Sequence, residues 1–221
     1  MTHVRALSPL EIRVLGVLCE KQRTVPDSYP LTLNSVVSGC NQKTSRSPIM
    51  EVTEAEAQLA LDSLRVLSLA TETSGGRAMR YAHNIDGVLK VPSQSIVLLT
   101  VLMLRGPQTP GELRIASDRM HNFADISSVE AFLEELAERA AGALVRKLPR
   151  LPGARESRWT HLLGGEPAAS GIEAFVEGGA DSPSLGEVAA LKAQVARLEA
   201  ELAELKALVG RVCVELGIGT H

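Results

Sequence analysis

Hydrophobic residues in the first ninety positions are spaced as in three helices followed by a β-hairpin. Residues 8–11 (Ser-Pro-Leu-Glu) form a capping box with proline at the first helical position, and apolar residues then recur at helical spacing. A second helix is predicted over 31–40, and a third begins at the capping box 53–56. Two short β-compatible runs within 69–82 flank a Gly-Gly pair, which predicts a hairpin.

The same order of elements recurs in residues 92–163. Pro26 lines up with Pro110 at an offset of 84, whereas Leu61 lines up with Leu133 at an offset of 72. The difference of 12 residues predicts a longer connection between the second and third helices of the first copy. Three helices followed by a two-stranded wing are typical of a winged helix, which is a variant of the helix-turn-helix.

We therefore expect a mostly α fold with small β wings (α+β), in which residues 1–91 and 92–163 form two tandem winged-helix domains. Some other pair of small α+β domains is the alternative. The longest uncharged stretch, 91–104, has 14 residues and is shorter than the ~20 that a membrane span needs. It is better interpreted as a buried helix, so no membrane association is expected.

The C-terminal quarter differs in composition. Residues 164–183 hold five glycines, two prolines and four acids but no Lys or Arg, which predicts a flexible acidic linker. Residues 184–217 then show a heptad pattern, which predicts a coiled-coil helix and a parallel homodimer. A helix that folds back on its own chain is the alternative. The expected dimerisation residues are Val188, Leu191, Val195, Leu198, Leu202, Leu205, Val209, Val212 and Leu216.

Composition limits the possible functions. Of the 221 residues 45% are hydrophobic, which is ordinary for a globular protein, but only 3% are aromatic, too few for a platform that stacks single-stranded bases. The net charge of −3 excludes a uniformly basic surface. Three well-separated cysteines and the lack of an apolar leader favour a cytoplasmic protein without a disulfide framework.

No motif for catalysis, a cofactor or a metal is evident. Residues 39–44 end in Lys-Thr like a phosphate-binding loop, but Val37 and Gln42 occupy the positions where that loop needs glycine. The five histidines are isolated in the sequence, which does not predict a metal site. We therefore expect a non-enzymatic protein with no cofactor.

The distribution of charge leaves two kinds of partner open. Both predicted third helices are acidic, which disfavours their insertion into the field of DNA phosphates. Wings and turns can instead contact phosphates, so we expect a DNA-associated regulatory protein that contacts the phosphates of double-stranded DNA through its wings and its basic turn. The alternative is an adaptor that binds another protein and no DNA. The candidate DNA-binding residues are Lys43, Arg46, Arg77, Arg80, Arg146, Lys147, Arg150, Arg155 and Arg158.

Five strings of the sequence resemble the YceH-like family of bacterial proteins. They are residues 20–22, 39–44, 105–113, 152–158 and 161–162. The resemblance covers nearly the whole chain and implies tandem winged-helix domains with a C-terminal coiled coil. It implies no particular biochemical function.

Overall fold

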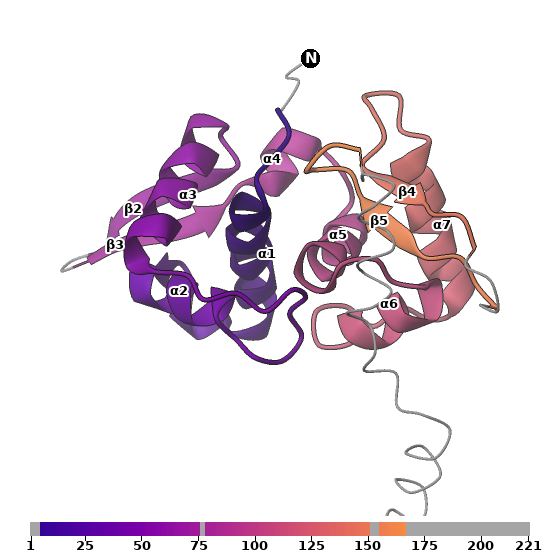
Figure 1. The fold of residues 1–221 in the computed structure, drawn as a ribbon, viewed down its shortest axis with the longest axis horizontal. Coiled ribbons are helices and arrows are strands. Elements are labelled where there is room, and N and C mark those ends of the chain that lie inside the picture. The colour runs from indigo at the N-terminus through magenta and orange to yellow at the C-terminus, as the bar shows by residue number, and fades with distance from the viewer. Residues whose placement is uncertain (1–4, 76–77, 151–154, 167–221) are drawn as a thin grey trace, which may run out of the picture. The chain divides into compact units, whose positions relative to one another are not determined.

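The computed structural model describes residues 5–75, 78–150 and 155–166, which form a mixed α+β fold (Figure 1). This confirms the predicted mixed class. The first half of the fold runs from a long helix through a short strand and two helices to a hairpin. Its elements are α1 (Pro9–Thr24), the 3-10 turn η1 (Pro26–Ser28), β1 (Leu31–Thr32), α2 (Leu33–Cys40), α3 (Glu54–Val66), β2 (Ala70–Gly75) and β3 (Ala78–His83).

The second half repeats this order after a short helix that the sequence pattern did not predict. The elements are α4 (Ile85–Leu89), α5 (Ser93–Arg105), α6 (Pro110–Ser117), α7 (Ile126–Ala137), β4 (Val145–Lys147) and β5 (Trp159–His161). In the first half Leu31 of β1 pairs with Tyr81 of β3, and in the second half Gln108 forms the corresponding single bridge to Trp159. The sheet of the first half thus has three strands and that of the second half has two, with the single bridge at Gln108 in the place that β1 takes in the first half.

Three predicted capping boxes are present at the starts of α1, α3 and α6. In each, the hydroxyl of Ser8, Thr53 or Thr109 accepts from the backbone N–H three residues later, and the glutamate there accepts from the cap's own N–H. These bonds satisfy two N–H groups that a helix start otherwise leaves without partners. Local sequence therefore fixes where these three helices begin.

The predicted alignment of Pro26 with Pro110 is wrong. Pro26 begins η1, and the helix that corresponds to α6 begins at Leu33, because Thr32 caps α2 as Thr109 caps α6. Residues 41–53 connect α2 to α3, and residues 118–125 connect α6 to α7. The first connection is thus thirteen residues long against eight, and the rest of the length difference lies before α2.

Helices α1 and α5 form the centre of the fold (Figure 1). Both are buried along most of their lengths, as the uncharged stretch over 91–104 predicted for α5. Gly16 of α1 lies against Met103 and Leu104 of α5 so closely that an added Cβ would come within 2.9 Å of Leu104 Cδ2. One continuous cluster of buried apolar residues extends from Leu7 to Trp159, so the two halves share a core.

The end of the described chain returns to its beginning. The backbone N–H of Leu7 donates to the carbonyl oxygen of Leu163 at 2.8 Å. The expected linker beyond Glu166 and the expected coiled coil over 184–217 lie outside the described residues. Within the described ranges, every helix is too short or too polar to cross a bilayer.

Candidate functional site

Three of the nine candidate DNA-binding cations form ion pairs with glutamates. Arg146 pairs with Glu166, and Arg158 pairs with Glu112 at 2.9 Å while it also donates to the carbonyl of Pro107. Arg46 pairs with Glu20, and its side chain is completely buried. A buried guanidinium cannot reach a DNA phosphate, so the prediction that Arg46 contacts DNA is wrong.

The other candidate cations are divided between the two halves of the fold. Arg80 donates to the carbonyl oxygen of Pro30 at 2.8 Å, and Lys147 lies 5.7 Å from the centre of the Trp159 ring. Lys43 is exposed in the α2–α3 connection, whereas Arg150 and Arg155 are exposed in the connection between β4 and β5. Arg77 lies outside the described residues.

The exposed face of α3 is apolar and acidic. The side chains of Leu59 and Val66 are 70% and 85% exposed, and Ala55 and Asp62 share their face because the four positions follow helical spacing. Three acids against Arg65 give the segment a net charge of −2. The acidity of α3 was predicted from the sequence, but its apolar stripe was not, because Leu59 and Val66 look like core residues until the buried face is known.

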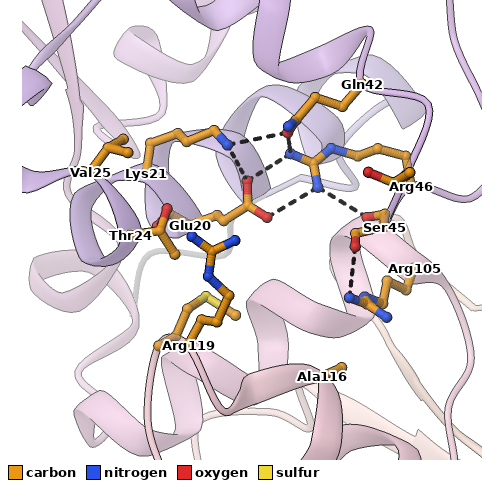
Figure 2. Close-up of a pocket in the computed structure, with 12 residues that line it drawn as sticks. Glu20, Lys21, Thr24, Val25, Gln42, Ser45, Arg46, Arg105, Ala116 and Arg119 are labelled. Atoms are coloured by element: carbon orange, nitrogen blue, oxygen red, sulfur yellow. Dashed lines mark hydrogen bonds and ion pairs between the residues drawn. The ribbon is translucent and has the colours of Figure 1, made fainter. Parts of the chain in front are cut away.

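A second candidate site is a small pocket of about 160 Å³ between the two halves, which we call the basic pocket (Figure 2). The end of α1 and the α2–α3 connection line one side, and the ends of α5 and α6 line the other. Three of the five strings that resemble the YceH-like family, 20–22, 39–44 and 105–113, contribute residues to it. Its lining residues are Glu20, Lys21, Thr24, Val25, Gln42, Thr44, Ser45, Arg46, Arg105, Ala116, Arg119 and Met120.

Arg46 is the structural centre of the basic pocket. Its guanidinium donates to both carboxylate oxygens of Glu20, at 3.1 and 2.6 Å, and to Gln42 Oε1 at 2.5 Å. It also donates to the carbonyl oxygens of Gly39 and Ser45, each at 3.0 Å. Arg46 therefore ties the α2–α3 connection to both α1 and α2.

Glu20 is the carboxylate that offsets the positive charges on this wall of the pocket. Burial alone would raise the pKa of Glu20, but the hydrogen bonds and charge of Arg46, together with Lys21, outweigh that effect and lower it. Lys21 Nζ lies 3.1 Å from Glu20 Oε2 and 3.2 Å from Gln42 Oε1. The single carboxylate of Glu20 is thus already shared by two cations.

The opposite wall supplies two more cations, Arg105 and Arg119. Arg105 donates to Ser45 Oγ at 2.8 Å, which links α5 to the α2–α3 connection. Burial lowers the pKa of Arg105, Glu20 opposes that effect, and Arg46 adds to it. Arg119 is exposed on the pocket's rim and points toward Glu20 (Figure 2). Within the described part of the chain neither Arg105 nor Arg119 has an acidic ion-pair partner.

The basic pocket was not predicted from the sequence. The strings that resemble the family contained Lys21 and Arg105, but they lie 84 positions apart, and no local signal marked Arg119. Only the packing of α1 against α5 brings these residues together. Among the described residues, no group of three His, Cys, Asp or Glu side chains is placed to hold a metal ion.

His161 lies half-buried on β5, which packs against α5, and it predicts a pH dependence of the fold's stability. Its Nδ1 atom is buried without a hydrogen-bond partner in the described ranges, and burial lowers its pKa from 6.5 to about 4. A group whose pKa is lowered on folding contributes stability above its unfolded pKa. That contribution is lost as the pH falls from 6.5 toward 4.

We expect acidification from pH 7 to pH 4 to lower the free energy of unfolding of both the wild-type chain and the variant His161→Gln. The decrease should be larger for wild type, by up to roughly 3 kcal/mol. Urea unfolding of both proteins at a series of pH values measures this difference. Other titrating groups are common to both proteins and cancel in the comparison. Parallel pH profiles for the two proteins would contradict the prediction.

Comparison with known proteins places the chain in a bacterial family. A family model described as "Protein of unknown function, DUF480" matches residues 7–154. A UPF0502 protein from Burkholderia orbicola is 59% identical over 216 residues, which cover 97% of this chain and 91% of the relative. A UPF0502 protein from Dechloromonas aromatica is 59% identical over 203 residues, 92% of this chain and 94% of the relative. The chain therefore belongs to the DUF480 (UPF0502) family.

Proposed function

We propose that this protein is a non-catalytic tandem winged-helix adaptor that binds a partner protein through the exposed face of α3. The repeated order of helices and hairpin supports the winged-helix assignment, as does the resemblance to the YceH-like family. In a winged helix the third helix is the element available for recognition. The chemistry of that helix therefore decides which partner is favoured.

The observation that supports a protein partner is the stripe on α3. Leu59 and Val66 are large, apolar and mostly exposed on one face, with Asp62 between them. Single exposed apolar residues are common, but an apolar stripe rimmed by polar groups is typical of a surface that binds a protein segment. Burial of both side chains would contribute several kcal/mol to association, at about 25 cal/mol per Å² of apolar surface.

The same helix is unsuited to DNA. A segment with a net charge of −2 is repelled by phosphates, and its one cation, Arg65, is already paired with Asp62 and Glu72. The wing cations do not compensate fully, because Arg146 and Arg158 are already paired with glutamates. The exposed face of α3 is instead complementary to a helix of a partner protein that carries apolar residues on one face and basic residues along its edge.

Site-specific photo-crosslinking in bacterial cells tests this proposal. A crosslinking amino acid at position 59 is expected to give one discrete adduct with a partner protein, and the added change Val66→Lys is expected to abolish it. The same amino acid at Glu130, which is exposed on the acidic helix α7, serves as the matched control. Identical adducts from positions 59 and 130, or an adduct that survives Val66→Lys, would show that the stripe is not the binding surface.

DNA is a second candidate partner because Lys43, Arg150 and Arg155 are exposed. Duplex binding that weakens steeply with salt and is reduced by Arg155→Ala would favour DNA over a protein partner. No binding at low salt would remove DNA from consideration. Self-association through the heptads of 184–217 also remains part of the proposal, since a dimer would present two α3 faces to a partner.

A further inference from the structure

We propose that the basic pocket binds a small phosphate-bearing anion, either free phosphate or diphosphate or the terminal phosphates of a nucleotide. The site is separate from the face of α3 and independent of the adaptor proposal. Arg105 and Arg119 are the groups that we expect to contact the anion directly, with Lys21 and Ser45 beside them.

The charge in the pocket is unbalanced. Four cations, Lys21, Arg46, Arg105 and Arg119, face one carboxylate, Glu20, so the lining has a net charge of +3. Arg46 and Lys21 already share the Glu20 carboxylate. Like charges collected in a partly buried space repel each other, and a multiply charged anion would relieve that repulsion. A monovalent carboxylate ligand would leave most of the positive charge unbalanced.

The free hydrogen-bonding capacity of the pocket lies on the wall formed by the ends of α5 and α6. Arg105 uses one nitrogen to donate to Ser45 Oγ, and its remaining donors have no partner in the described part of the chain. Arg119 has no hydrogen-bond partner among the described residues, and its guanidinium points into the pocket toward Glu20 (Figure 2). Guanidinium groups offer paired N–H donors whose geometry matches the oxygens of a phosphate.

The size of the pocket restricts the ligand. A volume of about 160 Å³ is about five times the ~30 Å³ that a water molecule occupies in the liquid. It is well below the ~300–1,000 Å³ typical of pockets that enclose a drug-sized molecule. The pocket can therefore enclose a phosphate or diphosphate group, and any nucleoside attached to it would extend outside.

A ligand in this position would bridge the two halves of the fold. Lys21 and Ser45 belong to the first half, whereas Arg105 and Arg119 belong to the second. An anion bound between them adds contacts that exist only in the folded chain, so its binding should stabilise that chain. The melting temperature should then rise with anion concentration, in addition to the direct binding signal.

Calorimetric titration of the full chain at low ionic strength tests the proposal with four probes: inorganic phosphate, diphosphate, a nucleoside triphosphate and a duplex oligonucleotide. We expect saturable one-site binding of diphosphate, tighter than that of phosphate. Arg119→Gln should weaken diphosphate binding about ten-fold or more, since a hydrogen bond to a charged group is lost. Lys90→Gln removes one exposed positive charge elsewhere and should leave the affinity nearly unchanged.

The outcomes separate the sources of the anion. Tighter binding of the triphosphate than of diphosphate would support the proposal with a nucleotide as the ligand, and the reverse order would support it with a free anion. Arg105→Gln should also weaken binding, and urea unfolding of that variant checks that its fold is intact. Equal affinities of wild type and Arg119→Gln, or saturable binding of the duplex alone, would overturn the proposal.

Discussion

Replacement of Arg46 by methionine is expected to lower the free energy of unfolding by about 3–5 kcal/mol, the cost typical of removing one partner from a buried ion pair. The Glu20 carboxylate, whose side chain is only 16% exposed, would keep Lys21 as its one ion-pair partner among the described residues. The carbonyl oxygens of Gly39 and Ser45 would also lose their donor. Urea denaturation followed by circular dichroism at neutral pH measures the change.

Two further variants separate the ion pair from a general effect on this connection. Lys43→Met removes an exposed lysine three positions earlier and should change stability by no more than about 0.5 kcal/mol. The double variant Arg46→Met with Glu20→Met removes both charges, and it should be more stable than Arg46→Met alone. Equal stabilities of Arg46→Met and wild type would show that the buried network is not needed for folding.

Truncation of Leu104 to alanine is expected to cost about 2–5 kcal/mol, because it opens a cavity where α5 contacts Gly16 of α1. Both halves should lose stability together, since they share this packing. The only tryptophan, Trp159, reports on the second half, and the two tyrosines, Tyr29 and Tyr81, report on the first. Tryptophan fluorescence and tyrosine near-ultraviolet dichroism should therefore show one coincident transition in urea.

Leu59→Ala is the matched control for that substitution. It removes the same atoms from a side chain that is 70% exposed, and its effect should stay within about 0.5 kcal/mol. If the tyrosine signal of Leu104→Ala kept the wild-type midpoint while the tryptophan signal shifted, the halves would unfold independently. That result would contradict the idea that α1 and α5 join them into one cooperative unit.

The helices with strong local signals were predicted well from the sequence. The caps at Ser8, Thr53 and Thr109 predicted three helix starts correctly, because a capping box depends on residues only three positions apart. The uncharged stretch in 91–104 likewise predicted the buried helix α5. Pro26 was misleading, because proline at the start of a helix and proline at the start of a 3-10 turn look the same in sequence.

The candidate sites were predicted less well because they depend on long-range contacts. Arg46 looked like a surface cation in a polar turn, but its partner Glu20 lies 26 positions earlier on another helix. Arg158 similarly finds Glu112 across 46 positions. A residue's charge can be read from the sequence, but its neutralisation depends on packing. For this reason the expected basic face contained residues that are already engaged within the fold.

The unequal lengths of the two helix connections suggest how a duplicated unit diverges. If the halves arose by duplication of one ancestral segment, each half would at first have contributed the same residues to the interface between them. The connection over 41–53 is longer than its counterpart over 118–125, and it places Ser45 and Arg46 at the seam between the halves. Because one copy carries extra residues, the two sides of this interface are no longer equivalent. Selection can then change each side of the seam separately while both copies keep the packing that holds them together.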